Sequence, residues 1–419
     1  MRLVLLTVVL VLLGLWAGCS VGLTLRLFSQ EEAAKEEEED QKIEEEPPAS
    51  IRIRRRMEPQ LRGSSDPKEK LPLAVRGVHA FYYPWYGTPE TDGAWAHWNH
   101  EHLPHWDATV QARYPPFRHD PTQKDIGAAF YPRLGPYSSN DATIVDDHAR
   151  QARLARIGVL VVSWYPSTHN ENVDEAIGLI LEAAAKFGLE VCFHLEPYEG
   201  RTALSVRKDV DLVLETYATH RAYHRIDGKP VFYAYDSYQI SPNDWTAAFH
   251  GARIFFICLV LDKKHLSDYL LNGGPFDAAY TYFGATSFTY ASNPKHWTDL
   301  ANLAKSVQKE FIPCVAPGYD DLSVRPWNGQ NRRERRNGDY YDDMWQNAID
   351  ARASIVAITS FNEWHEGTQI EEAVPFSTAG GKPYLDYGIG HPPTFYLDKT
   401  RDWVSKFEKS GDRSSSFVP

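Results

Sequence analysis

The chain has 419 residues, which allows two or three domains, or one large domain with appendages. Hydrophobic residues make up 43% of it and charged residues 24%, so the composition excludes a chain that is disordered throughout. The formal net charge of −12 argues against nucleic-acid binding as the main task, and we expect no nucleic-acid partner.

The N-terminal segment predicts a membrane anchor. Residues 3–25 carry no charge, and these 23 residues, at about 1.5 Å each, reach about 34 Å, enough to cross a hydrocarbon core of about 30 Å. Arg2 precedes this run and an acidic segment follows it, which places the N-terminus in the cytosol and the bulk of the chain in the lumen. A cleaved signal peptide is the alternative, with small residues at Gly18, Cys19 and Ser20. We expect residues 1–28 to form a cytosolic tip and a transmembrane signal-anchor of type II topology.

Residues 29–72 predict a charged, disordered stalk of low complexity. Residues 31–46 hold ten acids and two lysines, and residues 51–70 hold seven bases and three acids. Blocks of like charge repel one another and do not fold, so a solvated tether is the favoured interpretation. Contact of the basic block with lipid, or cleavage there, is the alternative.

From residue 76 onward, strand-like and helix-like segments alternate. Eight short apolar runs occupy residues 78–86, 157–166, 190–198, 230–237, 253–262, 276–284, 311–319 and 354–364. Most lack strict alternation, as expected for parallel strands covered on both faces, and the segments between them have helical spacing. Eight such repeats predict an α/β fold, a (β/α)8 TIM-like barrel over residues 73–410, followed by a tail at 411–419. Periodicity alone also allows an open doubly wound sheet, but the count of eight and the missing glycine-rich phosphate loop favour the barrel.

The cysteines and histidines give little support to a metal centre. The four cysteines form no CxxC pair, and we expect Cys192, Cys258 and Cys314 to be buried thiols. Histidines crowd the loop after the first strand, at His97, His100, His102, His105 and His119. Zinc needs three or four ligands on a fixed frame, whereas this loop is long and interrupted by proline. We expect hydrogen bonds within an ordered loop, no metal and no cofactor.

Polar and aromatic residues gather at the predicted strand ends. These residues are Trp85, Tyr86, Trp164, Tyr165, Glu196, Tyr198, Asp236, Asp262, Tyr282, Tyr319, Asp320, Asp321 and residues 362–366. In a barrel these ends converge on one face, where active sites form. Acids that bond hydroxyls, beside rings that cover C–H faces, indicate a carbohydrate ligand. The alternative for any single acid is that it caps the following helix.

Glu363 and Glu366, in the sequence FNEWHEGTQ, form the sharpest candidate for catalysis. On a continuing strand their spacing of three would place them on opposite faces, whereas in a turn both can address one bond. Two carboxylates held close together resist ionising together, so one can serve as an acid and the other as a base.

Several motifs together resemble glycoside hydrolase family 99, the glycoprotein endo-α-1,2-mannosidases, and within it the vertebrate endo-α-mannosidase-like members. The motifs are AFYYPWYGTPE, HWNHEHLPHWD, IGVLVVSWYP, FHLEPY, YTYF, PGYDD with RPWNGQN, and SFNEWHEGTQIEEAVP. The resemblance covers about residues 76–405. It implies a (β/α)8 barrel on a single-pass type II anchor in the Golgi membrane, with the catalytic domain in the lumen and metal-independent hydrolysis. The implied partner is a glucosylated high-mannose N-glycan, from which a glucosyl-mannose saccharide is released.

The resemblance also implies roles for individual residues. Glu363 would deprotonate the mannose 2-hydroxyl, whose oxygen displaces the leaving group to form a 1,2-anhydro sugar. Glu366 would protonate the leaving oxygen and then activate water, giving net retention. The implied substrate-binding residues are Tyr82, Tyr83, Trp164, His194, Glu196, Tyr198, Tyr282, Asn362 and Trp364. Barrel packing is the alternative for Tyr82 and Trp164.

Two segments depart from the pattern expected of the family. Residues 167–173 and residues 249–253 are both shorter than expected, while both glutamates are retained. The favoured hypothesis is an active retaining endo-mannosidase. A catalytically silent, lectin-like glycan-binding protein on the same barrel is the alternative.

Overall fold

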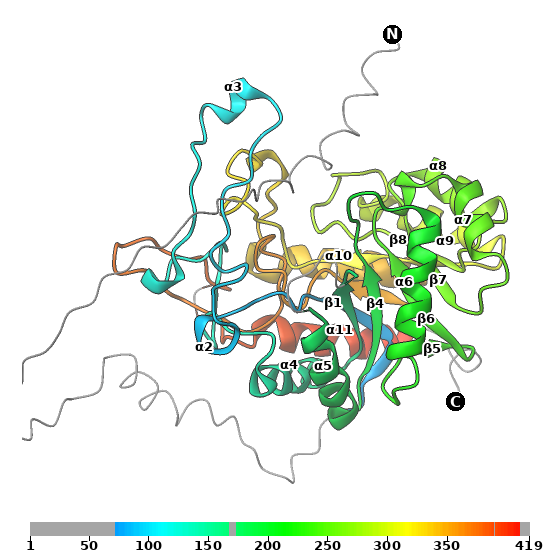
Figure 1. The fold of residues 1–419 in the computed structure, drawn as a ribbon, viewed down its shortest axis with the longest axis horizontal. Helices are drawn as coiled ribbons and strands as arrows, with labels where there is room; N and C mark the ends of the chain where they lie inside the picture. The colour runs from blue at the N-terminus through cyan, green and yellow to red at the C-terminus, as the bar shows by residue number, and fades with distance from the viewer. Residues whose placement is uncertain (1–71, 167–172, 389, 411–419) are drawn as a thin grey trace, which may run out of the picture. The chain divides into compact units, whose positions relative to one another are not determined.

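Parallel strands form a nearly closed barrel, as the apolar runs predict. In the computed structural model the strands pair in the order β10-β11-β1-β3-β4-β6-β7-β8-β9 (Figure 1). Their bounds are β1 Val75–Tyr82, β3 Ile157–Trp164, β4 Glu190–Leu195, β6 Lys229–Ala234, β7 Phe255–Leu259, β8 Ala278–Tyr280, β9 Glu310–Ile312, β10 Cys314–Val315 and β11 Val356–Ile358. Each of these pairings is parallel, so all the carboxyl ends lie at one end of the barrel.

The seventh predicted strand is interrupted at Pro313, and the ring closes there. β9 pairs with β8 on one side of the proline, and β10 pairs with β11 on the other. Proline has no N–H to donate, but its carbonyl accepts from the Ala357 amide at 3.1 Å. The next amide, of Cys314, donates to the Thr281 hydroxyl at 3.0 Å. Side-chain and carbonyl bonds therefore replace the regular ladder at the closure.

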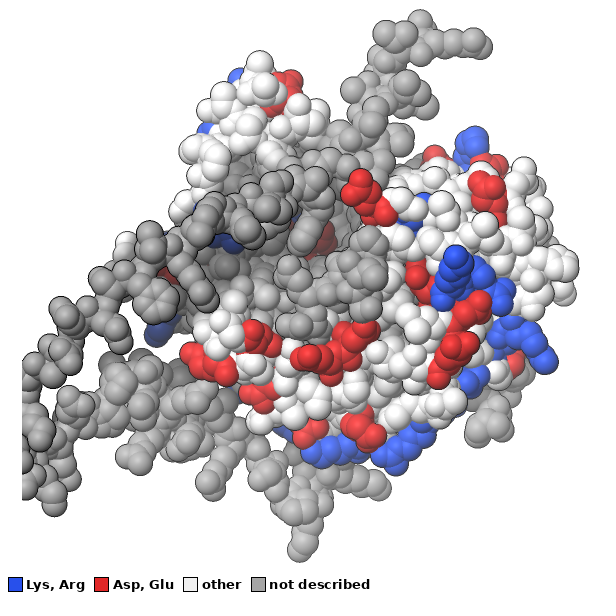
Figure 2. All heavy atoms as spheres, viewed as in Figure 1, with Lys and Arg blue, Asp and Glu red and all other residues white. Residues whose placement is uncertain are grey.

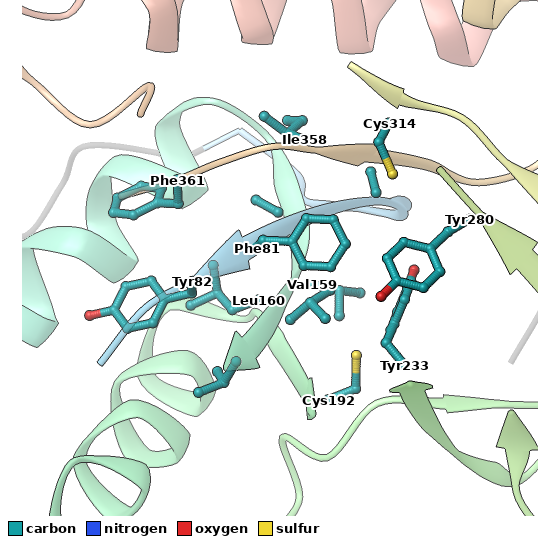
Figure 3. Close-up of a cluster of buried hydrophobic side chains, with 14 of the residues drawn as sticks. Phe81, Tyr82, Val159, Leu160, Cys192, Tyr233, Tyr280, Cys314, Ile358 and Phe361 are labelled. Atoms are coloured by element: carbon teal, nitrogen blue, oxygen red, sulfur yellow. The ribbon is translucent and has the colours of Figure 1, made fainter. Parts of the chain in front are cut away.

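The barrel interior is filled with aromatic side chains. The Phe81 ring lies 4.8 Å from His194 and 5.7 Å from both Tyr233 and Tyr280, measured between ring centroids. Figure 3 shows Phe81, Tyr233 and Tyr280 turned toward one another, with Tyr82 and Phe361 on the opposite side of β1. The interior is a packed core, so a substrate can bind only at its ends.

Helices surround the strands, and most begin where the sequence supplies a cap (Figure 1). Their bounds are α2 Pro89–Asp92, α3 Ala108–Gln111, α4 Ala142–Leu154, α5 Val173–Phe187, α6 Ala203–Thr216, α7 Pro242–Phe249, α8 Lys263–Leu266, α9 Trp297–Lys305, α10 Asp339–Asp350 and α11 Phe395–Ser410. The Asp141 side chain accepts from the first turn of α4, and Thr202 with Ser205 forms a capping box on α6.

Short strands and one-turn helices complete the fold. A small antiparallel pair joins β2 Tyr131–Pro132 to β12 Ala373–Val374, and β5 Arg225–Ile226 pairs with β6. The 3-10 helices are η1 Pro121–Gln123, η3 Ser237–Gln239, η5 Pro294–His296, η6 Gly329–Asn331 and η7 Arg336–Gly338, and η4 Ser267–Leu271 is a π-helix. After α7 the chain turns at Gly251, with a φ of 74°, so residues 249–253 form a tight connection into β7.

The structure describes residues 72–166, 173–388 and 390–410. The expected anchor (1–28), all but the last residue of the stalk (29–71), the short segment 167–172 and the tail 411–419 lie outside these ranges. Within them, no helix has the length and apolar character needed to cross a membrane. Cys192, Cys258 and Cys314 are buried free thiols, as predicted.

Gly158 offers a test of the packing between β1 and β3. A Cβ atom there would lie 2.3 Å from the Val75 carbonyl oxygen, inside van der Waals contact with backbone that cannot rotate away. We expect Gly158→Ala to lower the free energy of unfolding by about 2 kcal/mol or more, measured by denaturant titration. Gly178 in α5 is the matched control, because a Cβ there meets nothing within 4 Å. Gly178→Ala should be neutral or stabilising, and equal effects of the two substitutions would contradict this packing.

Candidate active site

The turn that follows β11 is tied to the end of β1. The Phe361 amide donates to the Phe81 carbonyl at 2.8 Å. The Asn362 side chain accepts from the Tyr83 amide at 2.7 Å and donates to the Tyr83 carbonyl at 3.0 Å. Two neighbouring strand ends are therefore held at a fixed separation, and the turn projects from them at the carboxyl end of the barrel.

Glu363 and Glu366 both lie in this turn, not on a continuing strand. The Glu363 amide donates to Ser360 Oγ at 2.7 Å, and Glu363 Oε1 accepts from the His365 amide at 3.0 Å. The Glu366 carbonyl accepts from the Asp320 amide at 2.8 Å, and the chain reverses at Gly367, whose φ is 60°. A Cβ on Gly367 would lie 2.7 Å from the Asp320 carbonyl oxygen, so the turn requires glycine.

The two carboxyl groups share a buried, electrostatically coupled environment. Burial raises the pKa of Glu363 well above its ordinary value, and the charge of Glu366 raises it further. Burial also raises the pKa of Glu366, to about 7, with Asp321 and Glu196 adding to the rise and Arg325 opposing it. Near neutral pH the pair therefore holds a proton that an isolated pair of glutamates would have lost.

One oxygen of this pair lacks a partner. Glu363 Oε2 is buried, and no group in the part of the chain that the structure describes forms a hydrogen bond with it. A buried carboxylate oxygen without a donor is costly, so it must either carry the proton or receive a hydrogen bond from a ligand. Glu363 is thus prepared to accept a hydrogen bond from a bound hydroxyl.

A cation approaches Glu366 from the loop after β10. Arg325 Nη1 lies 3.8 Å from Glu366 Oε1 and donates to Asp321 Oδ2 at 3.2 Å. The same Asp321 oxygen accepts from the Tyr319 hydroxyl at 2.9 Å and from Asn328 Nδ2 at 2.8 Å. Asp321 therefore orients Arg325, and the guanidinium lowers the pKa that burial would otherwise give Glu366.

Other strand ends bring further predicted site residues to the same place. The hydroxyls of Tyr83, after β1, and Tyr282, after β8, lie 2.5 Å apart. The charges of Glu196, Glu363 and Glu366 all raise the pKa of Tyr83, so this ring lies close to all three acids. His194 lies with Nδ1 3.0 Å from Glu196 Oε1, and its ring stacks on Tyr282. Tyr83, His194, Glu196 and Tyr282 thus surround the glutamate pair.

In the other five predicted residues, polar atoms of the side chain are hydrogen-bonded to neighbouring protein groups. Tyr82 is hydrogen-bonded through its hydroxyl to His148 of α4, and Trp164 Nε1 donates to Asp174 of α5. These contacts lie between the barrel and its helices, which fits the packing alternative for both residues. Asn362 and Trp364 are buried within the turn, where Trp364 Nε1 donates to the Tyr137 hydroxyl and to Glu371 Oε2 at 3.1 Å each. The Tyr198 hydroxyl is hydrogen-bonded to Ser205 and Asp209 at 2.6 Å each.

The strand-end acids divide between the two interpretations given by the sequence. Asp262 accepts from the His265 amide at 2.8 Å and caps α8, which is the helix-capping alternative. Asp236 is buried and accepts from the Tyr238 hydroxyl and from Gln239 Nε2, both at 2.8 Å. Asp321 and Glu196 both raise the pKa of Glu366, whose charge in turn raises that of Glu363, so these acids act on the glutamate pair.

Among the five histidines of the first loop, His100, His105 and His119 form hydrogen bonds through their rings, as expected for an ordered loop, whereas the His97 ring stacks on Trp85. His119 Nε2 donates to the Ser323 carbonyl at 2.7 Å, and His100 Nδ1 donates to the Glu101 carbonyl at 2.6 Å. His365 Nδ1 donates to the Gly127 carbonyl at 2.6 Å, which fixes the first loop against the turn that carries Glu363 and Glu366. Within the described ranges, no group of three or more candidate side chains is arranged to hold a metal ion.

The sequence interpretation missed two arginines that support the turn. Arg335 is buried among the rings of Phe130, Tyr387 and Tyr396, with its guanidinium carbon 4.3 to 4.8 Å from their centroids. Its Nη2 donates to the carbonyls of Gly367 and Gln369, at 2.9 and 2.7 Å. Arg325 belongs to the motif RPWNGQN, but the sequence indicated no role for it in the site. No local pattern marks either arginine, because each contacts the turn through the fold.

The comparisons with known proteins agree on one family. Residues 74–409 match the family model described as Glycosyl hydrolase family 99. Glycoprotein endo-alpha-1,2-mannosidase of Rattus norvegicus is 43% identical over 360 residues, covering 81% of this chain and 77% of the relative. The endo-alpha-1,2-mannosidase-like protein of Mus musculus is 42% identical over 369 residues, covering 83% and 80%. The solved structure of the GH99 endo-alpha-mannosidase from Bacteroides thetaiotaomicron has 41% identity and a TM-score of 0.75, covering 82% of this chain and all of that one.

The raised pKa of Glu366 predicts a pH-dependent cost in stability. Because its pKa is about 7 in the folded protein and about 4.5 in the unfolded chain, the folded state loses stability as the pH rises through this window. We expect Glu366→Gln to unfold at a higher free energy than the parent above pH 7, by about 3 kcal/mol, with no difference near pH 4. Denaturant titrations at several pH values measure this. Glu199→Gln, at an exposed glutamate after β4, should give no such trend, and a pH-independent effect of Glu366→Gln would contradict the assignment.

Proposed function

Because the chain belongs to glycosyl hydrolase family 99, we propose that its coupled glutamates cleave an internal α-1,2-mannosidic bond of glucosylated high-mannose N-glycans with retention. The chain is a glycoside hydrolase by this membership. The observation that carries the proposal is the unpartnered, buried oxygen of Glu363 beside Glu366, whose pKa of about 7 suits a group that gives and takes a proton near neutrality.

The first step forms three bonds and breaks three. Glu363 takes the proton of the mannose 2-hydroxyl while O2 forms a bond to C1, and the C1 bond to the leaving oxygen breaks. Glu366 gives its proton to that oxygen, so the products are a 1,2-anhydro sugar and a free leaving saccharide. In an α-mannoside O2 and the leaving group are trans-diaxial, so O2 can attack C1 from behind.

The second step reverses both proton transfers. Glu366 takes a proton from water while the water oxygen bonds to C1, and the C1–O2 bond breaks. Glu363 returns its proton to O2. Both residues recover their starting states, and two inversions at C1 give net retention.

The surroundings of the two carboxyl groups decide which of them carries the shared proton in the free protein. Arg325 faces Glu366 and favours its ionised form, whereas Glu363 Oε2 has no donor among the described residues. In the free protein the proton therefore favours Glu363. A bound 2-hydroxyl that donates to Glu363 supplies the missing hydrogen bond and shifts the proton to Glu366, where the leaving oxygen needs it. Substrate binding thus selects the productive protonation state.

Tyr83, Glu196 and Tyr282 are the residues that we propose to contact the reacting sugar, because they lie around the glutamate pair. The buried His194, with Nδ1 3.0 Å from Glu196 Oε1 and Nε2 2.6 Å from the Tyr280 hydroxyl, positions Glu196. The proposed sugar contacts do not include Tyr82, Trp164, Tyr198, Asn362 and Trp364. A type II anchor in the Golgi membrane, with this barrel in the lumen, completes the proposal and is supported by the uncharged run of residues 3–25.

Activity separates this proposal from the silent glycan-binding alternative. The protein should release a glucosyl-mannose saccharide from a glucosylated high-mannose oligosaccharide. Glu363→Gln and Glu366→Gln should each lower kcat by at least about 100-fold while the fold is kept, because each removes one proton transfer. Glu199→Gln should retain full activity. Binding of the oligosaccharide by the parent protein without cleavage would instead support the lectin-like alternative.

The charge of Arg325 should be visible in the pH profile. Because the guanidinium lowers the pKa of Glu366, Arg325→Met should raise it and move the alkaline limb of kcat/KM to higher pH by about 1 unit. Arg333→Met is the control, since Arg333 donates to the Thr286 carbonyl. An unchanged limb in Arg325→Met, or an equal shift in both variants, would contradict the role of Glu366 as the group that titrates.

A further inference from the structure

Three rings, two from the long loop after β1 and one from the loop after β10, form an aromatic surface. The His105 and Trp106 rings stack with centroids 3.7 Å apart, and Trp327 meets them edge-on at 4.8 and 5.4 Å. We call these three residues the outer aromatic platform. Trp106 is 59% exposed, although tryptophan has the largest apolar side chain. The platform therefore presents a ring face to solvent.

The platform is fixed in place by backbone hydrogen bonds. The Leu103 amide donates to the Val324 carbonyl at 2.7 Å, and Trp327 Nε1 donates to the Leu103 carbonyl at 3.0 Å. His119 adds a further bond across the two loops through the Ser323 carbonyl. The loop that carries α3 is therefore attached to residues 323–327, and the exposed rings are held in one orientation.

Residues 323–328 also reach the glutamate pair. Arg325 lies 3.8 Å from Glu366, and Asn328 donates to the same Asp321 oxygen that orients Arg325. Trp327 lies between these two residues in the chain. Two residues span at most about 7 Å of chain, so the platform lies near Arg325 and hence on the side of Glu366, the residue that gives its proton to the leaving oxygen in the proposed mechanism.

The charge around the platform suits an uncharged partner. Figure 2 shows the protruding loop as mostly uncharged atoms, whereas acidic side chains gather lower on the same face, over α4 and α5. Arg118 and Glu101 at the base of the loop neutralise each other in an ion pair. The one acid next to Trp106 in the chain, Asp107, uses its carboxylate to cap α3, where it accepts from the Thr109 and Val110 amides. Flat aromatic faces without a net charge match the C–H faces of a neutral sugar better than a phosphate or an acidic peptide.

We propose that the outer aromatic platform binds a sugar ring of the leaving saccharide, outside the reacting mannose. The ring stacks on Trp106, with Trp327 at its edge, and so favours substrates whose leaving group is an oligomannose branch over those with a short leaving group. This inference rests on the proposed function for its direction, because Glu366 identifies the leaving-group side.

Two substrates of different leaving-group length test the platform. One is a glucosylated high-mannose oligosaccharide, and the other is an aryl glycoside of the same glucosyl-mannose unit, which has no sugar on the leaving side. Trp106→Ala should lower kcat/KM for the oligosaccharide by about two- to tenfold and leave the aryl glycoside unchanged. Equal losses on both substrates, or no loss on either, would overturn the proposal.

A matched control lies on the same loop. Phe117 is 44% exposed, and its ring contacts His102 and His119, away from Trp327. Phe117→Ala should change neither substrate. Substitution of Trp106 leaves the Trp327 hydrogen bond to Leu103 in place, so the loop should keep its conformation in this variant.

A binding measurement separates failure of the platform from failure of the proposed function. Calorimetric titration of a glucose-free oligomannose saccharide, the leaving product, needs no catalysis. It should give a Kd that Trp106→Ala raises by the same two- to tenfold. If the parent protein cleaves neither substrate, the proposed function fails while this titration still decides the platform. Equal affinities of the parent protein and Trp106→Ala for the saccharide would overturn the proposal. So would a Trp106→Ala variant that loses binding to phosphatidylserine vesicles but keeps its affinity for the saccharide.

Discussion

The structure depends on placing two carboxyl groups together, one buried and the other largely shielded from water. Burial alone disfavours the charge on each group, and their proximity disfavours it further, which is why the pKa values of Glu363 and Glu366 both rise. Such a pair costs folding free energy at neutral pH, so the surrounding chain must hold it in place. Glycosidase chemistry needs a carboxyl group that keeps its proton near pH 7, although the burial that produces such a group destabilises the folded state.

The barrel supplies that support from several directions. Asn362 bonds the turn that carries both glutamates to the end of β1, and Arg335 donates to two of its carbonyls from among three rings. The Asp320 amide donates to the carbonyl of Glu366 in the same turn. The aromatic interior below leaves no space for the turn to collapse into (Figure 3). The loop after β10 then adds a cation, Arg325, that lowers the pKa of Glu366. Each of these elements belongs to a different part of the sequence, and parallel strands bring them to one end.

Local patterns predicted the repeating elements well and the directions of side chains poorly. The eight apolar runs are strands, since buried parallel strands need continuous apolar sequence. Tyr82 and Tyr83 are adjacent and chemically alike, yet only Tyr83 approaches the acids, because neighbouring strand residues point to opposite faces. The interruption at Pro313 depends on a hydroxyl from Thr281, and the influence of Arg325 depends on the loop after β10. Neither contact leaves a trace in the spacing of nearby residues.

The shared proton is the central claim, and it can be observed directly. A carbon-13 NMR titration of glutamate side-chain carboxyl groups follows Glu363 and Glu366 individually when each is assigned from its glutamine variant. The account predicts that one carboxyl group of the pair keeps its proton well above pH 4.5 and releases it with a midpoint near pH 7. Two independent titrations near pH 4.5 would show that the groups neither are buried together nor interact, and would contradict the account.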